Sequence, residues 1–173
     1  GNADTSLAVT YGAGVSWCYE TNQGMDLNKT VDTYAFRDDA GVMTKLAYEL
    51  GNARLRTGTS YGNNTIFYQL LQHRVETAFT SDELANLQAT ADYLATFLPV
   101  LDTAKMQRPD AELIKAEYRM NIKMAMFACH LGAARLNGGL ARTSDLPQGV
   151  RLALAAELEP LIPEYRQLWL ARN

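Results

Sequence analysis

The sequence predicts a mainly α-helical fold, a bundle of five or six helices that follows a short extended segment at the N-terminus. Candidate helix caps recur along most of the chain, apolar residues repeat between them at helical spacing, and Gly or Pro marks most of the expected helix ends. One stretch differs from the rest. LAVTYGAGVSWCY, residues 7–19, is rich in β-branched, aromatic and glycine residues and is expected to be extended.

Six runs with helical spacing follow this segment, and each is bounded by caps, glycines or prolines. In chain order they cover residues 27–36, 40–56, 65–74, 80–101, 109–137 and 147–171. Asp26 can cap the first run, and Asp38 or Asp39 can cap the second. The tetrapeptide TSDE, which begins at Thr80, has the pattern of a capping box and predicts the start of the fourth run.

Four prolines and one loop predict where these helices begin, bend or end. Pro109 is expected at the first helical position of the fifth run. Pro99 predicts a kink or an end in the fourth run, and Pro160 and Pro163 predict a bend or a short break in the last. Residues 56–64 are rich in Gly, Ser and Asn and are expected to form a loop.

The fifth run is expected to form the most buried helix. It is the longest run, and Gly138-Gly139 ends it. Its second half, from Met124 to Ala134, contains no residue that is formally charged at neutral pH. Because a helix that is apolar on most sides lies in the middle of its bundle, we expect the core to be centred on this helix.

Composition excludes several classes of partner. The 173 residues are 47% hydrophobic and 20% charged, which is typical of one globular domain with a core. The net charge is -3 and no basic run is present, so neither nucleic acid nor a membrane surface is expected as a partner. No apolar stretch approaches the roughly 18–20 residues of a membrane span. The two cysteines, Cys18 and Cys129, are expected to be small buried apolar side chains.

The residues alone predict no complete active site. No glycine-rich phosphate loop or dinucleotide fingerprint is present, and no cofactor is expected. His73 and His130 lie in different predicted helices, and neither has a His or Cys at metal-ligand spacing. His130 lies in the most buried run, where a hydrogen-bonded core histidine is the more common role.

Two segments resemble the bacterial members of glycoside hydrolase family 20, the β-N-acetylhexosaminidases, that carry a helical C-terminal domain. YGAGVSWCYETNQGMDLNKTVDTYAFRDDAGVMTKLAYELGN, residues 11–52, is similar to the end of their catalytic barrel. There, a strand with a Trp near its end leads through an Asn-containing turn into a helix, and a Phe-x-Asp and a Leu-Gly-Asn follow, matched by Phe36-Arg37-Asp38 and by residues 50–52. EYRQLWLARN, residues 164–173, resembles their closing motif.

This resemblance implies that the extended segment is the last strand of a barrel whose other strands lie upstream. Residues 1–36 would then be the end of the catalytic barrel, and residues 37–173 would be a helical C-terminal domain. The Asp-Glu pair of the family, which supplies the general acid and orients the substrate's acetamido group, would also lie upstream, so this chain alone is expected to be inactive. The implied partners are the upstream barrel, an N-acetylhexosamine-containing glycan and, for the helical domain, a second copy in a homodimer.

The resemblance implies substrate-binding roles for two residues of this segment. Trp17 matches a Trp that walls the sugar pocket, and Glu20 matches an acidic residue that holds sugar hydroxyls. Many members of the family place these residues two positions apart, whereas here they are three apart. In a regular strand Glu20 would face away from Trp17, so a turn or bulge at Trp17 is needed to bring both to one pocket. The alternatives are a packing role for Trp17 and a solvated loop carboxylate for Glu20.

A second interpretation is an independent helical binding or oligomerisation module with no catalytic role. The apolar stripe over residues 84–101 and the apolar helix over residues 113–136 could bury against a second subunit as well as against a barrel. An upstream reading frame of several hundred residues with an Asp-Glu pair after a strand would favour the glycosidase interpretation. A native start near Asn2 would favour the independent module.

Overall fold

The computed structural model describes residues 3–59, 65–75, 78–137, 139 and 142–173. Residues 60–64 of the predicted loop and Gly138 of the predicted helix end lie outside the described residues. The described chain is mainly helical, as predicted, and no strand is assigned in it. Its α-helices are α1 (Ala3–Trp17), α2 (Tyr19–Asn22), α3 (Leu27–Val31), α4 (Met43–Asn52), α5 (Ile66–Leu71), α6 (Ser81–Ala95), α7 (Phe97–Asp102), α8 (Ala111–Leu136), α9 (Gln148–Leu158) and α10 (Leu161–Arg172).

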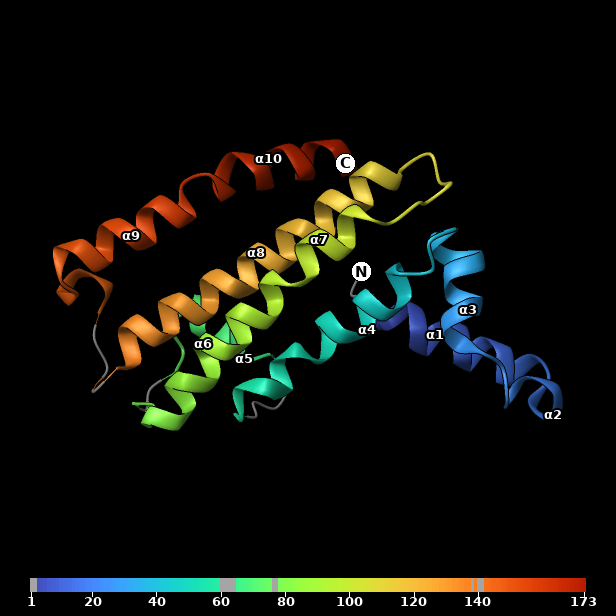
Figure 1. The fold of residues 1–173 in the computed structure, drawn as a ribbon, viewed down its shortest axis with the longest axis horizontal. Coiled ribbons are helices and arrows are strands. Elements are labelled where there is room, and N and C mark those ends of the chain that lie inside the picture. The colour runs from blue at the N-terminus through green and yellow to red at the C-terminus, as the bar shows by residue number, and fades with distance from the viewer. Residues whose placement is uncertain (1–2, 60–64, 76–77, 138, 140–141) are drawn as a thin grey trace.

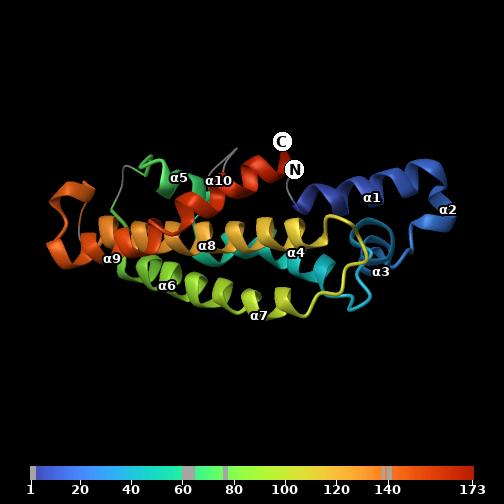
Figure 2. The same ribbon diagram turned by 90° about the horizontal axis from the view of Figure 1, so that it is seen from above.

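Helix α8 lies at the centre of the bundle and contacts helices on several sides. Helices α6 and α7 run antiparallel along one side of it, and α9 and α10 return along another (Figure 1). Figure 2 shows that α1, α2 and α3 extend beyond the main body at one end of an elongated molecule. After α3 the chain continues through a π-helix, η1 (Asp32–Phe36), into α4, which is followed by the 3₁₀-helix η2 (Ala53–Thr57).

The prediction that the fifth run is the most buried is confirmed, because α8 contributes more buried side chains than any other described helix. Ile122, Cys129 and Leu136 are fully enclosed. Three apolar clusters share α8: one with α4 and α7, one with α5 and α6, and one with α9 and α10. The continuous apolar surface of this helix therefore has a partner on each side, which is why no polar face interrupts Met124 to Ala134.

The predicted caps are present, with one shift. Thr80 and Glu83 form the reciprocal capping box of α6, and the Asp26 carboxylate accepts a hydrogen bond from the Lys29 backbone at 3.0 Å. Helix α4 begins at Met43, three residues later than predicted. The Asp38 carboxylate still caps it, at 2.9 Å from the Val42 nitrogen and 3.1 Å from the Met43 nitrogen, because the chain folds back over the intervening turn.

The prolines interrupt the helices where the sequence predicts. The fourth run is divided into α6 and α7 at Thr96, just before Pro99. The last run is divided into α9 and α10 at Glu159 and Pro160, and Pro163 lies in the first turn of α10, where no intrahelical N–H bond is lost. Pro109 is not the first helical position, since α8 begins at Ala111 and Pro109 lies in the preceding turn.

The prediction of an extended N-terminal segment is wrong for this structure. Residues 7–19 lie in α1 and the start of α2, and only Cys18, with φ -152° and ψ 96°, is extended. A strand needs a neighbour to satisfy its backbone N–H and C=O groups, and the described chain offers no second strand. A helix satisfies these groups within the segment, so a β-favouring composition is overridden by the lack of a pairing partner.

Candidate functional site

The structure places Trp17 and Glu20 on either side of a turn. Trp17 is the last residue of α1 and its side chain is 90% exposed. Glu20 lies in the first turn of α2, is exposed, and its carboxylate forms no hydrogen bond or ion pair with another described residue. Because the extended Cys18 separates two helices, the strand geometry behind the three-residue spacing argument does not apply to this structure. Substrate binding by this pair stays a prediction.

Several large apolar side chains are exposed in the same region. We call them the N-terminal apolar set: Val9, Tyr11, Trp17, Tyr19 and Tyr34. All lie in the segment that the resemblance assigns to the catalytic barrel. Covering these side chains with another protein segment or a ligand would remove apolar surface from water and so would be favourable.

The Phe36-Arg37-Asp38 motif fastens this N-terminal segment to the loop before α8. We call the contact between residues 35–39 and residues 105–108 the clasp. Backbone bonds join Asp39 N to Lys105 O at 3.1 Å and Gln107 N to Arg37 O at 2.8 Å. The Arg108 guanidinium donates a hydrogen bond to the Ala35 carbonyl at 2.7 Å.

Asp38 is the centre of the clasp. Its side chain is only 6% exposed, and its two carboxylate oxygens accept hydrogen bonds from four backbone N–H groups. One oxygen accepts from Ala40 and Lys105, at 3.2 and 2.6 Å, and the other accepts from Val42 and Met43. One carboxylate therefore holds the start of α4 and the loop before α8 in a fixed relation.

The closing motif WLARN is fastened to α8 through its arginine. Arg172 donates to both carboxylate oxygens of Glu117, at 2.7 and 2.6 Å, and its remaining terminal nitrogen lies 3.5 Å from Asp110. Asp110 in turn accepts from Arg108 at 2.9 and 3.2 Å. The hydrogen bonds that Arg172 donates to Glu117 raise the pKa of Arg172, and those that Asp110 accepts from Arg108 lower the pKa of Asp110, so both groups stay charged near neutral pH.

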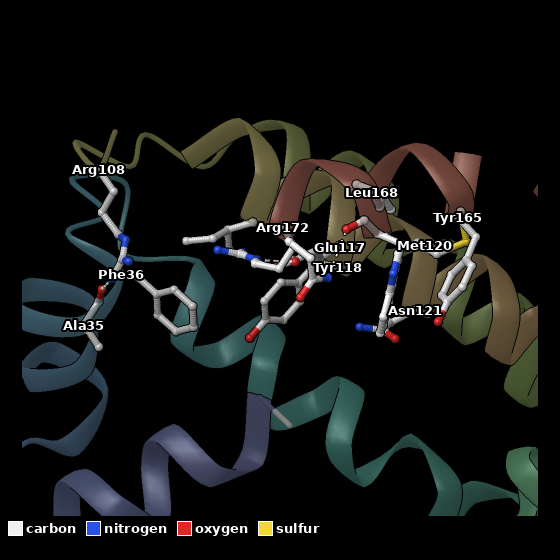
Figure 3. A pocket seen from close by; sticks show the side chains of 13 residues that line it. Ala35, Phe36, Arg108, Glu117, Tyr118, Met120, Asn121, Tyr165, Leu168 and Arg172 are labelled. Carbon is white, nitrogen blue, oxygen red and sulfur yellow. Dashed lines mark hydrogen bonds and ion pairs between the residues drawn. The ribbon is translucent and has the colours of Figure 1, made fainter. Parts of the chain in front are cut away.

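A groove opens between α8, α10 and η1 beside this network (Figure 3). Its volume is about 830 Å³. Figure 3 shows Phe36 and Arg108 at one end, Asn121 and Tyr165 at the other, and Arg172 between them. Its lining includes the side chains of Phe36, Glu117, Tyr118, Asn121, Tyr165 and Trp169. We refer to this feature as the α8–α10 groove.

The sequence interpretation did not assign a role to these groove residues. Tyr165 and Trp169 belong to the segment that resembles a closing motif, and the sequence gives no separate indication of a role for Glu117 or Asn121. The available signal was spacing, since each pair is separated by four residues and so lies on one face of its helix. That the two faces meet depends on the return of α9 and α10 along α8, which no local pattern predicts.

Other candidate sites have structural roles or are not found. The His130 ring nitrogen Nδ1 lies 2.9 Å from Glu157 and so joins α8 to α9; the ring is hydrogen-bonded as predicted, but its side chain is 31% exposed and is not enclosed in the core. Among the described residues no group of three or more His, Cys, Asp and Glu side chains could hold a metal ion. No helix in the described ranges is long and apolar enough to cross a membrane.

The two cysteines differ in environment. Cys129 is fully enclosed, as predicted, and burial raises the pKa of its thiol to about 12. Cys18 is exposed, contrary to the prediction, because it lies in the turn between α1 and α2. A hydrogen bond with Thr21, at 3.3 Å, lowers the pKa of the Cys18 thiol.

We expect one fast thiol when the native chain reacts with a chromogenic disulfide reagent. The thiolate is the reactive form, so Cys18 should react at a lower pH than an ordinary thiol, and its rate should rise with pH until its lowered pKa is passed. Cys129 should react only after unfolding in urea. Cys18→Ser should abolish the fast phase. Two thiols of equal rate in the native chain would contradict these environments.

Comparison with known proteins gives no match: no family model, no curated protein and no solved structure is significantly similar to this chain.

Proposed function

We propose that this chain is the C-terminal part of a β-N-acetylhexosaminidase-like glycoside hydrolase. In this proposal residues 1–36 join an upstream catalytic barrel, and residues 37–173 form a helical domain that packs on it. The chain itself contributes at most Trp17 and Glu20 to the sugar pocket, and the catalytic carboxylates lie in the barrel. The proposal rests on the resemblance of residues 11–52 and 164–173 to family 20.

One observation supports the proposal most. The N-terminal apolar set is exposed, and Trp17 is its most exposed member. Burial of these side chains would lower the free energy by roughly 25 cal/mol for each Å² of apolar surface removed from water. A barrel that packs against residues 1–36 would cover the other members of the set, with Trp17 at its mouth.

The two motifs that carry the resemblance also make contacts that stabilise this fold. The Phe-x-Asp motif provides the clasp, and the closing motif provides the Arg172–Glu117 pair. The first holds the loop before α8 and the second holds α8 itself, each against a segment that is distant in sequence. A domain that must present residues 1–36 to a barrel in a fixed orientation requires fastening of this kind.

The test is hydrolysis of a β-linked N-acetylglucosaminide by the full-length parent protein and by this chain. The parent should be active and the isolated chain inactive. In the parent, Trp17→Ala should lower kcat/KM by at least about tenfold, because an aromatic wall positions the sugar ring. This loss corresponds to roughly 1.4 kcal/mol of transition-state stabilisation.

Glu20→Gln and the thermal midpoint serve as controls in the parent. Glu20→Gln should have a smaller effect than Trp17→Ala if the three-residue spacing turns the carboxylate away from the sugar. The thermal midpoint of the Trp17 variant should stay near that of the parent. A variant that unfolds many degrees early but keeps its kcat/KM would show that Trp17 is a packing residue. A parent with no glycosidase activity would reject the proposal altogether.

The second candidate function is an oligomerisation module, which a specific observation favours. Leu152 on α9 and Ile162 and Leu170 on α10 are exposed apolar side chains on the outer helices. Such residues could meet those of a second copy in a homodimer. Sedimentation of the isolated chain distinguishes the cases, since a monomer at micromolar concentration would leave this candidate without support.

A further inference from the structure

We propose that the α8–α10 groove binds an uncharged saccharide, at a site separate from the one expected at Trp17. The inference goes beyond the proposed function and does not need the barrel. Its volume of 830 Å³ falls within the range of roughly 300–1,000 Å³ that is common for small-molecule sites. The ligand class follows from three properties of the groove: its charge, its exposed aromatic rings and its hydrogen-bonding groups.

The charges of the groove cancel. Arg172 is held by both oxygens of Glu117, and Arg108 by both oxygens of Asp110. Arg108, Arg172 and Glu117 line the groove, and Asp110, just outside the lining, contacts both arginines, so two anions offset the two cations and little net charge is left to attract an ionic ligand. An anion would have to compete with Glu117 or Asp110 for its arginine, and a cation would have to displace an arginine. The groove is therefore suited to an uncharged ligand.

Two aromatic rings provide apolar contact surface. Tyr165 and Trp169 are one helical turn apart on α10, and their side chains are 54% and 60% exposed. Neither ring is used in an aromatic pair or a cation–π contact with another described residue. Rings of this kind combine a large apolar face with a polar edge, which suits a ligand that has a C–H face and hydroxyl groups.

Polar groups beside the rings can meet hydroxyl groups. The Asn121 side-chain amide, next to Tyr165 in Figure 3, forms no hydrogen bond with another described residue, so it can both donate and accept. The Glu117 carboxylate has lone pairs beyond the two that Arg172 occupies, and hydrogen bonds to a charged group are about twice as strong as neutral ones. The ion pair thus orients a carboxylate toward a ligand without adding net charge.

The two tryptophans allow a direct binding test on the 173-residue chain. The Trp17→Phe variant leaves Trp169 as the sole tryptophan, and its fluorescence should change and saturate when N,N′-diacetylchitobiose or cellobiose is added. The Trp169→Phe variant keeps an aromatic ring but should lose the fluorescence change. A disaccharide of galacturonic acid, which is anionic, should bind at least about tenfold more weakly than either neutral probe.

Calorimetry then tests which residues bind. Trp169→Ala should weaken binding of the neutral disaccharides at least about tenfold, and Asn121→Ala should also weaken it. Leu170→Ala is the matched control, because Leu170 is the next residue on α10, is 68% exposed and does not line the groove. It should leave the affinity unchanged. Equal urea midpoints for the three variants and the parent chain would show that the fold is intact.

Three results would overturn the inference. The first is no fluorescence or calorimetric response to either neutral disaccharide at about 10 mM, tenfold above a weak Kd on the order of 1 mM. The second is tighter binding of the anionic disaccharide. The third is a dimer that Trp169→Ala converts to a monomer without any saccharide binding, which would make the groove a protein interface. None of these results depends on whether the parent hydrolyses N-acetylglucosaminides.

Discussion

Asp38→Ala is expected to lower the free energy of unfolding by at least about 3 kcal/mol. The substitution removes one acceptor group and leaves four backbone N–H groups without their partner. A buried donor without a partner costs about 1–3 kcal/mol, and the Met43 N–H is buried, whereas the Ala40 and Lys105 N–H groups can regain part of this from water. Urea unfolding of the isolated chain, followed by circular dichroism, measures the loss.

Asp39→Ala is the matched control for this prediction. Asp39 is the adjacent residue of the same type, but its carboxylate is exposed and accepts only from the Gln107 side chain, at 2.9 Å. Its loss should cost less than about 1 kcal/mol, as expected for an exposed polar contact. Equal losses for both variants would contradict the central role of Asp38 in the clasp. A loss below about 1 kcal/mol for Asp38→Ala would mean that the loops need no fastening.

The sequence predicted those parts of the fold that depend on local interactions. The capping box at Thr80, the cap at Asp26 and the break near Pro160 depend on residues within one turn of each other, and each is present. The central position of α8 was predicted because an uncharged segment of eleven residues, 124–134, can be stable only if it is enclosed.

Features that depend on distant contacts were not predicted. The start of α4 is displaced because Asp38 bonds to a loop 67 residues away, which spacing cannot reveal. The N-terminal segment was predicted to be extended from composition, yet strand formation requires a neighbour that the described chain lacks. The α8–α10 groove likewise exists only because α10 lies across the first half of α8.

The packing of α9 and α10 on α8 combines an apolar cluster with three contacts between ionisable side chains, Lys123–Glu164, His130–Glu157 and Arg172–Glu117. The expected energies of the two kinds of contact indicate which one dominates. Phe127, which is 4% exposed, lies in a cluster with buried leucines of α9 and α10. The Lys123 ammonium contacts both oxygens of Glu164, at 3.0 and 2.8 Å, but both side chains are partly exposed. Ion pairs of this kind contribute about 0–1 kcal/mol, whereas truncation of an enclosed phenylalanine costs about 3–5 kcal/mol.

Phe127→Ala should therefore lower the free energy of unfolding by about 3–5 kcal/mol, and Lys123→Ala by less than about 1 kcal/mol. Tyr34→Ala is the control for the loss of an aromatic ring, because its side chain is exposed and its removal should change stability by less than about 0.5 kcal/mol. Urea unfolding gives the three values, and amide hydrogen exchange should show α9 and α10 losing protection first in the Phe127 variant. Equal losses for Lys123→Ala and Phe127→Ala would contradict the prediction, because a partly exposed ion pair would then contribute as much as the enclosed ring to holding these helices on α8.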